Sequence, residues 1–439
     1  MTHEALCSMT ARDLAQAIRD RRVTAVEVAR AHLDRIEAVN GRLNAVVQIG
    51  PDALAQAHAA DEALRHGSTA PLLGVPFTVK DWIETAGLIC AAGDPARASY
   101  RPHEDAVVVA RMRAAGAVLL GKTNVGQGAP VYARPNNPHD EALTPGGSSS
   151  GEAAIIAAGG SPLGLGSDSG GSIRWPAHCC GIAGLKPTTG LVPNTGHFPR
   201  IGHMSDPRTT IGPMARSVGD LAVALRVIAG ADAGDPGSVP VPIGDPAEVR
   251  LETLRVGWYT ATPGAVPTAD TVATVERAAR TLAGLGCTVE AVAPPRLEEA
   301  LPITEAYWAG VQSASFDEWR PPRASVLAGE QIDRARFEWE RVTRDMLAFM
   351  RRYDVLLAPV AATPAPPHEG WGMEQYLYTL PYSLTGQPVV VVPFGRAEAL
   401  PIGVQVVARP WQDAVALAVG EALEAAAAPA SLPPPPLGR

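Results

Sequence analysis

The sequence predicts an α/β protein: one large domain in which a central, twisted, mixed β-sheet is enclosed by α-helices. Apolar segments of strand length alternate with longer segments of helical periodicity along most of the 439 residues, as expected for a largely parallel sheet. Hydrophobic residues make up 46% of the chain and charged residues 19%, which is typical of globular proteins rather than disordered or fibrous ones. A chain of this length can bury the core that such a sheet requires.

Residues 1–70 are expected to form a helical layer packed on the core. The segments 11–20 and 24–40 carry apolar residues at three- and four-residue spacing, and Thr24 is suited to cap the second of them. The body of the domain is expected over residues 71–300. It begins with a strand in "GVPFTVKD" (74–81), a helix in "EDAVVVARMRAAG" (104–116) and a buried strand in "AVLLGKTN" (117–124).

The later part of the chain continues the same pattern. A strand, a helix and a strand follow one another in "LRVGWY" (254–259), "TADTVATVERAARTLAGLG" (268–286) and "CTVEAVAPP" (287–295), which predicts a βαβ unit. Residues 346–425 carry three further apolar strands of the same core, and residues 426–439 form a proline-rich tail.

Residues 301–345 are expected to form a helical cap over the core, with a lid over a pocket as the alternative. Their aromatic residues are Trp308, Phe316, Trp319, Phe337 and Trp339.

Charge and composition exclude several classes of protein. The net charge is −8 and basic residues are scattered, so we expect no nucleic-acid partner. No apolar run approaches the roughly 20 residues that span a bilayer, and the mixed acidic, basic and apolar residues at the N-terminus lead us to expect no signal peptide. Five cysteines without an export signal predict a reduced, cytoplasmic protein. The adjacent Cys179 and Cys180 have no second ligand cluster, so we expect no metal and no cofactor.

A first short motif, "GAVLLGKT" (116–123), matches the phosphate-loop pattern G-x-x-x-x-G-K-[ST]. In a phosphate loop a strand comes first and the four intermediate residues curl around phosphate. Here those four residues, Ala117 to Leu120, form an apolar run preceded by a helix. The order of elements is inverted, so nucleotide binding is kept only as an alternative.

A second motif, "GSSSG" (147–151), matches the nucleophile elbow G-x-S-x-G with Ser149 as nucleophile. An elbow needs a hydrophobic strand directly before it, whereas Pro145 and two glycines precede this one. A Ser-His-Asp hydrolase also needs a histidine base. The candidates for that base are His178, His197, His203 and His368.

Several longer blocks, in order along the chain, favour a third interpretation. They are "GVPFTVKD", "EDAVVVARMRAAGAVLLGKTN", "TPGGSSSGEAA", "GSDSGGSIRWPAHCCGIAGLKPTTG" and "GPMARSVGDL". With these blocks the sequence resembles the amidase signature family, from about residue 10 to residue 425. The resemblance implies the α/β fold of that family and the hydrolysis of an amide C–N bond. A further alternative is a noncatalytic interaction protein on the same scaffold, but the chain has all three residues that the family uses for catalysis, which is hard to reconcile with it.

The resemblance implies a Ser-Ser-Lys triad. It makes Lys80 the base, Ser148 the proton relay, with a cis peptide bond before it, and Ser172 the nucleophile. It assigns the oxyanion hole to Ser169, Gly170, Gly171 and Ser172, and supporting roles to Ser149, Asp168 and Arg174. For the substrate pocket it indicates Gly128, Ala129 and Pro130, in a run of small residues that starts at Gly126.

The residue types suit this chemistry. A serine hydroxyl must lose its proton as it attacks, so it needs a base within hydrogen-bond reach. A free lysine, with a pKa of about 10.4, is neutral in fewer than about one molecule in a thousand at pH 7. Lys80 ends an apolar run containing Val75, Phe77 and Val79, where burial disfavours the ammonium. Strand alternation turns Asp81 to the opposite face.

The expected substrates are small molecules: aryl or alkyl amides, and by extension esters and carbamates. The small residues after "GKTN" indicate an open pocket wall, and Trp371, Tyr376, Tyr378 and Tyr382 are candidates to cover it. The alternative within the family is the glutaminase subunit of a tRNA-dependent amidotransferase. Its acidic, methionine-containing block after "GKTN" is replaced here by "VGQGAPVY". We therefore expect a partner-independent enzyme, either a monomer or a homodimer.

Overall fold

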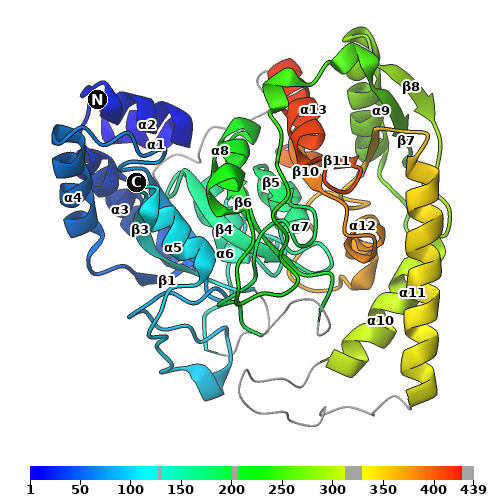
Figure 1. Ribbon diagram of the computed structural model, residues 1–439, viewed down its shortest axis with the longest axis horizontal. Coiled ribbons are helices and arrows are strands. Elements are labelled where there is room, and N and C mark those ends of the chain that lie inside the picture. Colours follow the sequence, from blue (N-terminus) through cyan, green and yellow to red (C-terminus); the bar gives the residue numbers. More distant parts are fainter. Residues whose placement is uncertain (127–130, 200–205, 312–328, 428–439) are drawn as a thin grey trace.

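A single mixed β-sheet of eleven strands runs through the part of the chain that the structure describes (Figure 1). The computed structural model describes residues 1–126, 131–199, 206–311 and 329–427. The strand order is β1-β3-β2-β4-β6-β5-β10-β11-β9-β7-β8. The strands are β1 (Val46–Ile49), β2 (Pro76–Lys80), β3 (Val118–Thr123), β4 (Leu163–Asp168), β5 (Ala183–Lys186), β6 (Thr210–Ala215), β7 (Arg255–Trp258), β8 (Thr288–Ala291), β9 (Val355–Pro359), β10 (Val389–Ala397) and β11 (Leu400–Ala408).

Strand directions decide where a site can form. β2 lies between β3 and β4 and is parallel to both, so the carboxyl ends of these three strands meet at one edge of the sheet. In open α/β sheets, ligands bind outside the carboxyl ends of parallel strands. β7 is parallel to β8, with helix α9 between them along the chain, which confirms the expected βαβ unit.

Helices cover both faces of the sheet, and the strands alternate their side chains between the two. Val390 and Val392 of β10 belong to the core shared with α5, α8, α9 and α13, whereas Val391 belongs to the core shared with α3, α6 and α7. The helices are α1 (His3–Ser8), α2 (Ala11–Arg19), α3 (Ala25–Leu43), α4 (Ala53–Arg65), α5 (Val107–Ala114), α6 (Ser150–Ala157), α7 (Arg174–Cys180), α8 (Val218–Ile228), α9 (Ala269–Gly284), α10 (Ala300–Val311), α11 (Gly329–Met350), α12 (Leu380–Leu384) and α13 (Asp413–Ala426).

The N-terminal helices pack at one end of the sheet (Figure 1). Thr24 caps α3: its side chain accepts from the Glu27 N–H while the Glu27 side chain accepts from the Thr24 N–H. The structure differs from the expected all-helical segment at β1, which pairs antiparallel with β3 at the sheet's edge. Four residues are too short a run for strand periodicity to stand out from the helices on either side.

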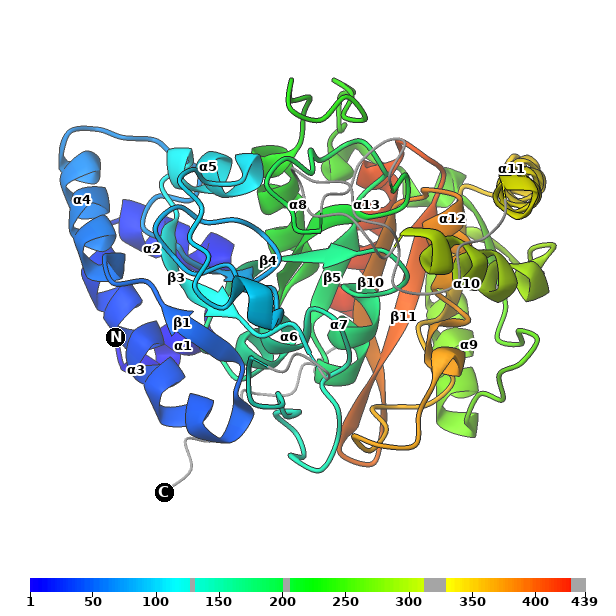
Figure 2. The same cartoon turned by 90° about the horizontal axis from the view of Figure 1, so that it is seen from below.

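Helices α10 and α11 lie beside α12, on the side of the molecule away from the N-terminal helices (Figures 1 and 2). Trp339 packs against Tyr307, with 5.2 Å between ring centroids, and its Nε1 donates to the Leu384 carbonyl at 2.7 Å. Phe337, in contrast, is 61% exposed and covers no core. Phe316, Trp319 and the tail from residue 428 lie outside the described residues.

Three further observations concern the described residues. No helix among them is long and apolar enough to cross a membrane. All five cysteines are buried and unpaired. No group of three or more His, Cys, Asp or Glu side chains within the described ranges is placed to hold a metal ion.

Candidate active site

Two loops and two strand ends meet at the carboxyl edge of β2 and β4. Lys80 is the last residue of β2 and Asp168 the last of β4. The loop before α6 carries Ser148, and the loop between β4 and α7 carries Ser172. The two loops are joined by a hydrogen bond from the Ser149 N–H to the Ser172 carbonyl, at 3.1 Å. Segments from three places in the sequence therefore converge on one site.

Lys80 is fully buried and points its ammonium nitrogen at hydroxyl groups. Its Nζ donates to Ser148 Oγ at 2.7 Å and to Ser167 Oγ at 3.1 Å. Desolvation lowers the pKa of Lys80 to about 7, against the opposing charges of Asp168 and Glu152. A substantial fraction of Lys80 is therefore a neutral amine, able to accept a proton, at neutral pH.

Ser148 and Ser172 line the same cavity, whose volume is about 520 Å³. The Gly147–Ser148 peptide bond is cis, as the resemblance implies. The Tyr376 hydroxyl donates to the Gly147 carbonyl at 3.2 Å and so ties the C-terminal part of the chain to this loop. Other described residues that line the cavity include Trp82, Gly126, His197, Pro199 and Trp371.

The loop from Ser169 to Ser172 is held from below by the Asp168 carboxylate. Its Oδ1 accepts from the Gly171 N–H at 2.8 Å and its Oδ2 from the Ile173 N–H at 3.1 Å. Ser169, Gly170 and Ser172 line the cavity, and Gly171 is not among the lining residues. The Gly171 N–H is thus engaged by Asp168. This differs from the expectation that Gly171 contributes a donor to an oxyanion hole.

Gly171 is required for another reason. Its φ is +142°, and a Cβ built there would lie 2.5 Å from Thr379 Oγ1 and 2.9 Å from Tyr376 Cδ1. A side chain at this position would displace the segment that packs against the loop.

Asp168 and Arg174 form an ion pair of 2.8 Å, and both side chains are fully buried. Arg174 also donates to the Thr379 carbonyl and to Ser383 Oγ, both at 2.7 Å. Burial alone would raise the pKa of Asp168, but the charge and hydrogen bonds of Arg174 hold it at about 2. The ion pair therefore holds the loop from Ser169 to Ser172 in place.

Asp168→Asn is expected to lower the free energy of unfolding by about 3–5 kcal/mol, because it leaves the Arg174 charge buried without its partner. The pKa of Asp168 is depressed from 3.8 to about 2, so its contribution is present above about pH 4 and is lost as the pH falls toward 2. Urea unfolding at pH 7 measures the effect. The matched control is Asp245→Asn, which breaks a half-exposed 2.9 Å pair with Arg226 and is expected to cost less than about 1 kcal/mol. Equal losses in the two variants would contradict this account.

Comparison with known proteins agrees with this geometry. The family model described as Amidase matches residues 27–324 and 311–417. The chain belongs to the amidase signature family. It is 36% identical to a subunit of the glutamyl-tRNA(Gln) amidotransferase of Chloroflexus aurantiacus, over 95% of this chain and 96% of that protein. It is 33% identical to the indoleacetamide hydrolase of Bradyrhizobium diazoefficiens, over 94% and 85% of the two chains.

Solved structures agree with the family. The native peptide amidase of Stenotrophomonas maltophilia superposes with a TM-score of 0.83 at 29% identity, covering 96% of this chain and 97% of that one. The expected single α/β domain with a mixed sheet is therefore confirmed. As a member of the amidase signature family, the protein is a hydrolase of carbon–nitrogen bonds.

The structure also shows where the phosphate-loop motif "GAVLLGKT" and the nucleophile-elbow motif "GSSSG" lie in this amidase fold. "GAVLLGKT" runs into β3, and its Lys122 is buried with Nζ donating to Thr85 Oγ1 at 3.2 Å. These residues form a strand and not a phosphate-binding loop. Ser149 Oγ is buried and donates to the Ser167 carbonyl at 3.3 Å.

No histidine of the described residues is seen to hydrogen bond with Ser149. His178 and His368 bind backbone carbonyls elsewhere, and His203 lies outside the described residues.

Sequence reasoning missed Ser167 and the role of His197. His197 Nε2 lies 2.8 Å from Ser167 Oγ, which also accepts from Lys80, so the three side chains form a continuous chain. Burial lowers the pKa of His197 to about 3, and the imidazole is therefore neutral. Ser167 meets Lys80 only because β4 pairs with β2, and that pairing is not readable from local pattern.

Glu152 was also missed. It is buried in α6, where it accepts from the hydroxyls of Thr78 in β2 and Thr123 in β3. Desolvation raises the pKa of Glu152 to about 7. Three elements that carry the site are thereby locked to one another.

The expected pocket residues have mixed outcomes. Gly128, Ala129 and Pro130 lie outside the described residues, while Gly126 lines the cavity. Of the four aromatic residues expected to cover it, Trp371 and Tyr376 line the cavity and pack edge-on against Trp175.

Tyr378 and Tyr382 do not cover the pocket. They are fully buried in a separate core, where the Tyr382 hydroxyl lies 2.6 Å from that of Tyr259.

Proposed function

We propose that the protein hydrolyses uncharged aryl and alkyl amides through an acyl-enzyme on Ser172, with Ser148 as proton relay and Lys80 as base. The observation that carries this proposal is the 2.7 Å hydrogen bond between Lys80 Nζ and Ser148 Oγ, on a lysine that is fully buried. Burial lowers the pKa of Lys80 to about 7, close to the value that serves a general base at neutral pH.

In the first step, Ser172 Oγ attacks the carbonyl carbon of the amide. Its proton passes to Ser148, and the proton of Ser148 passes to Lys80. The tetrahedral intermediate collapses as the C–N bond breaks, and the relay returns a proton to the departing nitrogen, which leaves as an amine or ammonia. Water then attacks the acyl-enzyme by the same relay and releases the carboxylic acid. Esters and carbamates would react by the same steps.

Backbone N–H groups of the loop from Ser169 to Ser172 would stabilise the oxyanion. Gly171 is excluded because its N–H binds Asp168, which leaves Ser169, Gly170 and Ser172 as the candidates among the residues that line the cavity. Such donors lower the barrier because charge develops on the carbonyl oxygen only as the reaction proceeds.

The cavity wall supports an uncharged, partly aromatic substrate. Trp82, Trp371 and Tyr376 present aromatic surface to it. None of the described lining residues is a lysine or an arginine, and the sole carboxylate among them, that of Asp206, is held by the Arg208 and Thr209 N–H groups. An amino acid substrate carries a carboxylate that would need a cation there.

The second candidate function is the glutaminase subunit of an amidotransferase. It is favoured by the 36% identity with the amidotransferase chain of Chloroflexus aurantiacus, which extends over 95% of the present chain. The lack of a described cation in the cavity favours the first function, as does the absence of the acidic, methionine-containing block after "GKTN". We propose that the protein acts without a partner protein.

A hydrolysis screen tests the substrate class. Phenylacetamide, acetamide, a p-nitroanilide, an aryl carbamate and glutamine are compared by kcat/KM with the purified chain alone. We expect phenylacetamide to exceed glutamine by at least about 100-fold, since an unpaired buried carboxylate costs several kcal/mol. A preference for glutamine, or activity only in the presence of a partner protein, would overturn the proposal in favour of the second candidate.

A further inference from the structure

Arg208 is a fully buried arginine that lies next to the candidate active site without lining its cavity. Its Nη2 donates to Ser169 Oγ at 3.3 Å, and its Nε lies 3.7 Å from Asp206 Oδ1. Its guanidinium carbon lies 4.1 Å from the centroid of the Tyr307 ring on α10 and 5.7 Å from that of Trp339 on α11. One side chain thus joins the loop of Ser172 to both helices of the pair.

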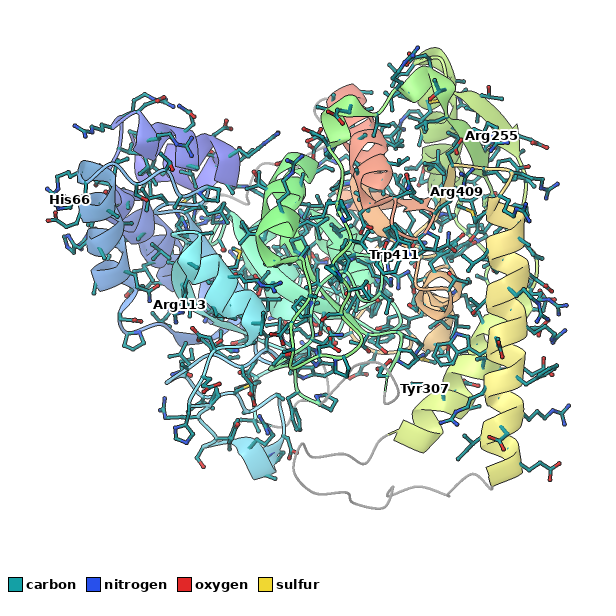
Figure 3. All side chains as sticks on the ribbon, in the orientation of Figure 1. His66, Arg113, Arg255, Tyr307, Arg409 and Trp411 are labelled. Carbon is teal, nitrogen blue, oxygen red and sulfur yellow. The ribbon has the colours of Figure 1, made fainter. Side chains whose placement is uncertain are left out.

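The segment 206–209 forms a partition between two cavities. Asp206 and Thr209 line the cavity that contains Ser172, whereas Pro207 lines a second cavity of about 660 Å³. Tyr307 and Trp339 line the second cavity too, on the side of α10 and α11. Trp411 also lines the second cavity, and Figure 3 labels both Tyr307 and Trp411. Arg208 lies between the two cavities: it contacts Ser169, which lines the first, and Tyr307, which lines the second.

We propose that Arg208 is a positioning residue for turnover: anchored by the ring of Tyr307, it holds Ser169 and thereby aims the oxyanion-binding loop at the substrate carbonyl. The inference rests on the proposed function of Ser172 and of the loop from Ser169 to Ser172. The helix pair then helps to set the reaction rate through Arg208, although it carries no reacting group.

The chemistry of arginine suits this role. A buried charge is tolerated only where its partners replace water, and Arg208 lies beside the Asp206 carboxylate, the Ser169 hydroxyl and the face of the Tyr307 ring. The planar guanidinium can stack on Tyr307 while its edge donates to Ser169. A lysine keeps the charge but offers neither the stacking plane nor the fixed fork.

The expected kinetic signature is a change in kcat with little change in KM. The oxyanion forms only in the transition state, so a displaced loop costs turnover while ground-state binding in the cavity is retained. Arg208→Met and Ser169→Ala are each expected to lower kcat about tenfold, less than the 10²–10³ that loss of a donor itself typically costs.

A double-mutant cycle is the decisive experiment. If Arg208 acts through Ser169, the double variant Arg208→Met/Ser169→Ala falls by about tenfold, like either single variant, and not by the roughly 100-fold of independent effects. Ser169→Ala removes only a hydroxyl, so its own effect on kcat can be read even if Arg208→Met folds poorly. Thermal unfolding of each variant reports on folding separately.

The anchor is tested with Tyr307. Tyr307→Phe keeps the ring face and is expected to keep kcat within about twofold, whereas Tyr307→Leu removes the face and is expected to lower kcat several-fold. The control is Arg216→Lys. Arg216 is a largely buried arginine that donates to the Cys7 and Met9 carbonyls, and its change is expected to leave kcat unchanged.

Three outcomes would overturn the inference: additive losses in the cycle, a loss confined to KM, or equal effects of the two Tyr307 variants. These outcomes bear on the role of Arg208 once the Ser172→Ala variant has been shown to be inactive. If Ser172→Ala retains activity, the proposed function fails instead, and the two failures are thereby distinguished.

Discussion

Ser172→Ala is expected to lower kcat for amide hydrolysis by about 10⁴-fold or more. The hydroxyl oxygen of Ser172 is the only protein atom in the proposed mechanism that bonds to the substrate carbon, so its loss removes the acyl-enzyme route altogether. The residual rate would come from oxyanion stabilisation and binding alone. Single-turnover kinetics with phenylacetamide, together with thermal unfolding of the variant, separate lost chemistry from lost folding.

A matched serine controls this variant. Ser161 is fully buried, and its hydroxyl donates to the Leu163 carbonyl at 2.7 Å before β4 begins. Ser161→Ala removes the same group from a buried position and is expected to retain near-native kcat. If Ser172→Ala retained more than about one part in a hundred of native kcat, the assignment of the nucleophile would be wrong.

Lys80 gives the second large effect. Lys80→Met is expected to lower kcat at pH 7 by about 10³-fold or more, because Ser148 loses the acceptor for its proton. In the native enzyme the active form of Lys80 is the neutral amine, and its pKa is about 7. The value of kcat/KM should therefore fall about tenfold for each pH unit below 7 and level off above about pH 8. Measuring kcat/KM from pH 5 to pH 9 tests this.

Two other buried groups have pKa values in the same range and serve as controls. Burial lowers the pKa of Lys186 to about 7 and raises that of Glu152 to about 7. Lys186→Met and Glu152→Gln should both preserve the acidic limb of the pH profile if Lys80 causes it. Disappearance of the limb in either variant would assign it to that residue and contradict the role of Lys80.

Much of the fold was predictable because its strands are strongly apolar and its helices strongly periodic. β2, β3 and the βαβ unit of β7, α9 and β8 lie where those patterns indicate. β1 was missed because four residues give too weak a signal, and its position depends on pairing with β3. The exposure of Phe337 shows the opposite limit: an aromatic residue in a helical pattern need not face a core.

The site was predictable where a residue belongs to a long sequence block. Lys80, Ser148 and Ser172 were named through the family resemblance, and their neighbours Asp168 and Arg174 form the expected ion pair. Ser167, Arg208 and the role of His197 were not identified, because each of these side chains meets the site through a contact between segments distant in the chain. The engagement of the Gly171 N–H by Asp168 is likewise a matter of loop geometry and not of composition.

Trapping of the acyl-enzyme tests the proposed chemistry most directly. The native protein is mixed with a p-nitrophenyl ester at pH 5, where Lys80 is largely protonated and deacylation is slow, then quenched and analysed by mass spectrometry with fragment-ion sequencing. We expect one acyl group per chain, on Ser172, and none in the Ser172→Ala variant. An acyl group on Ser148 or Ser149, or labelling that persists in Ser172→Ala, would contradict the proposed mechanism.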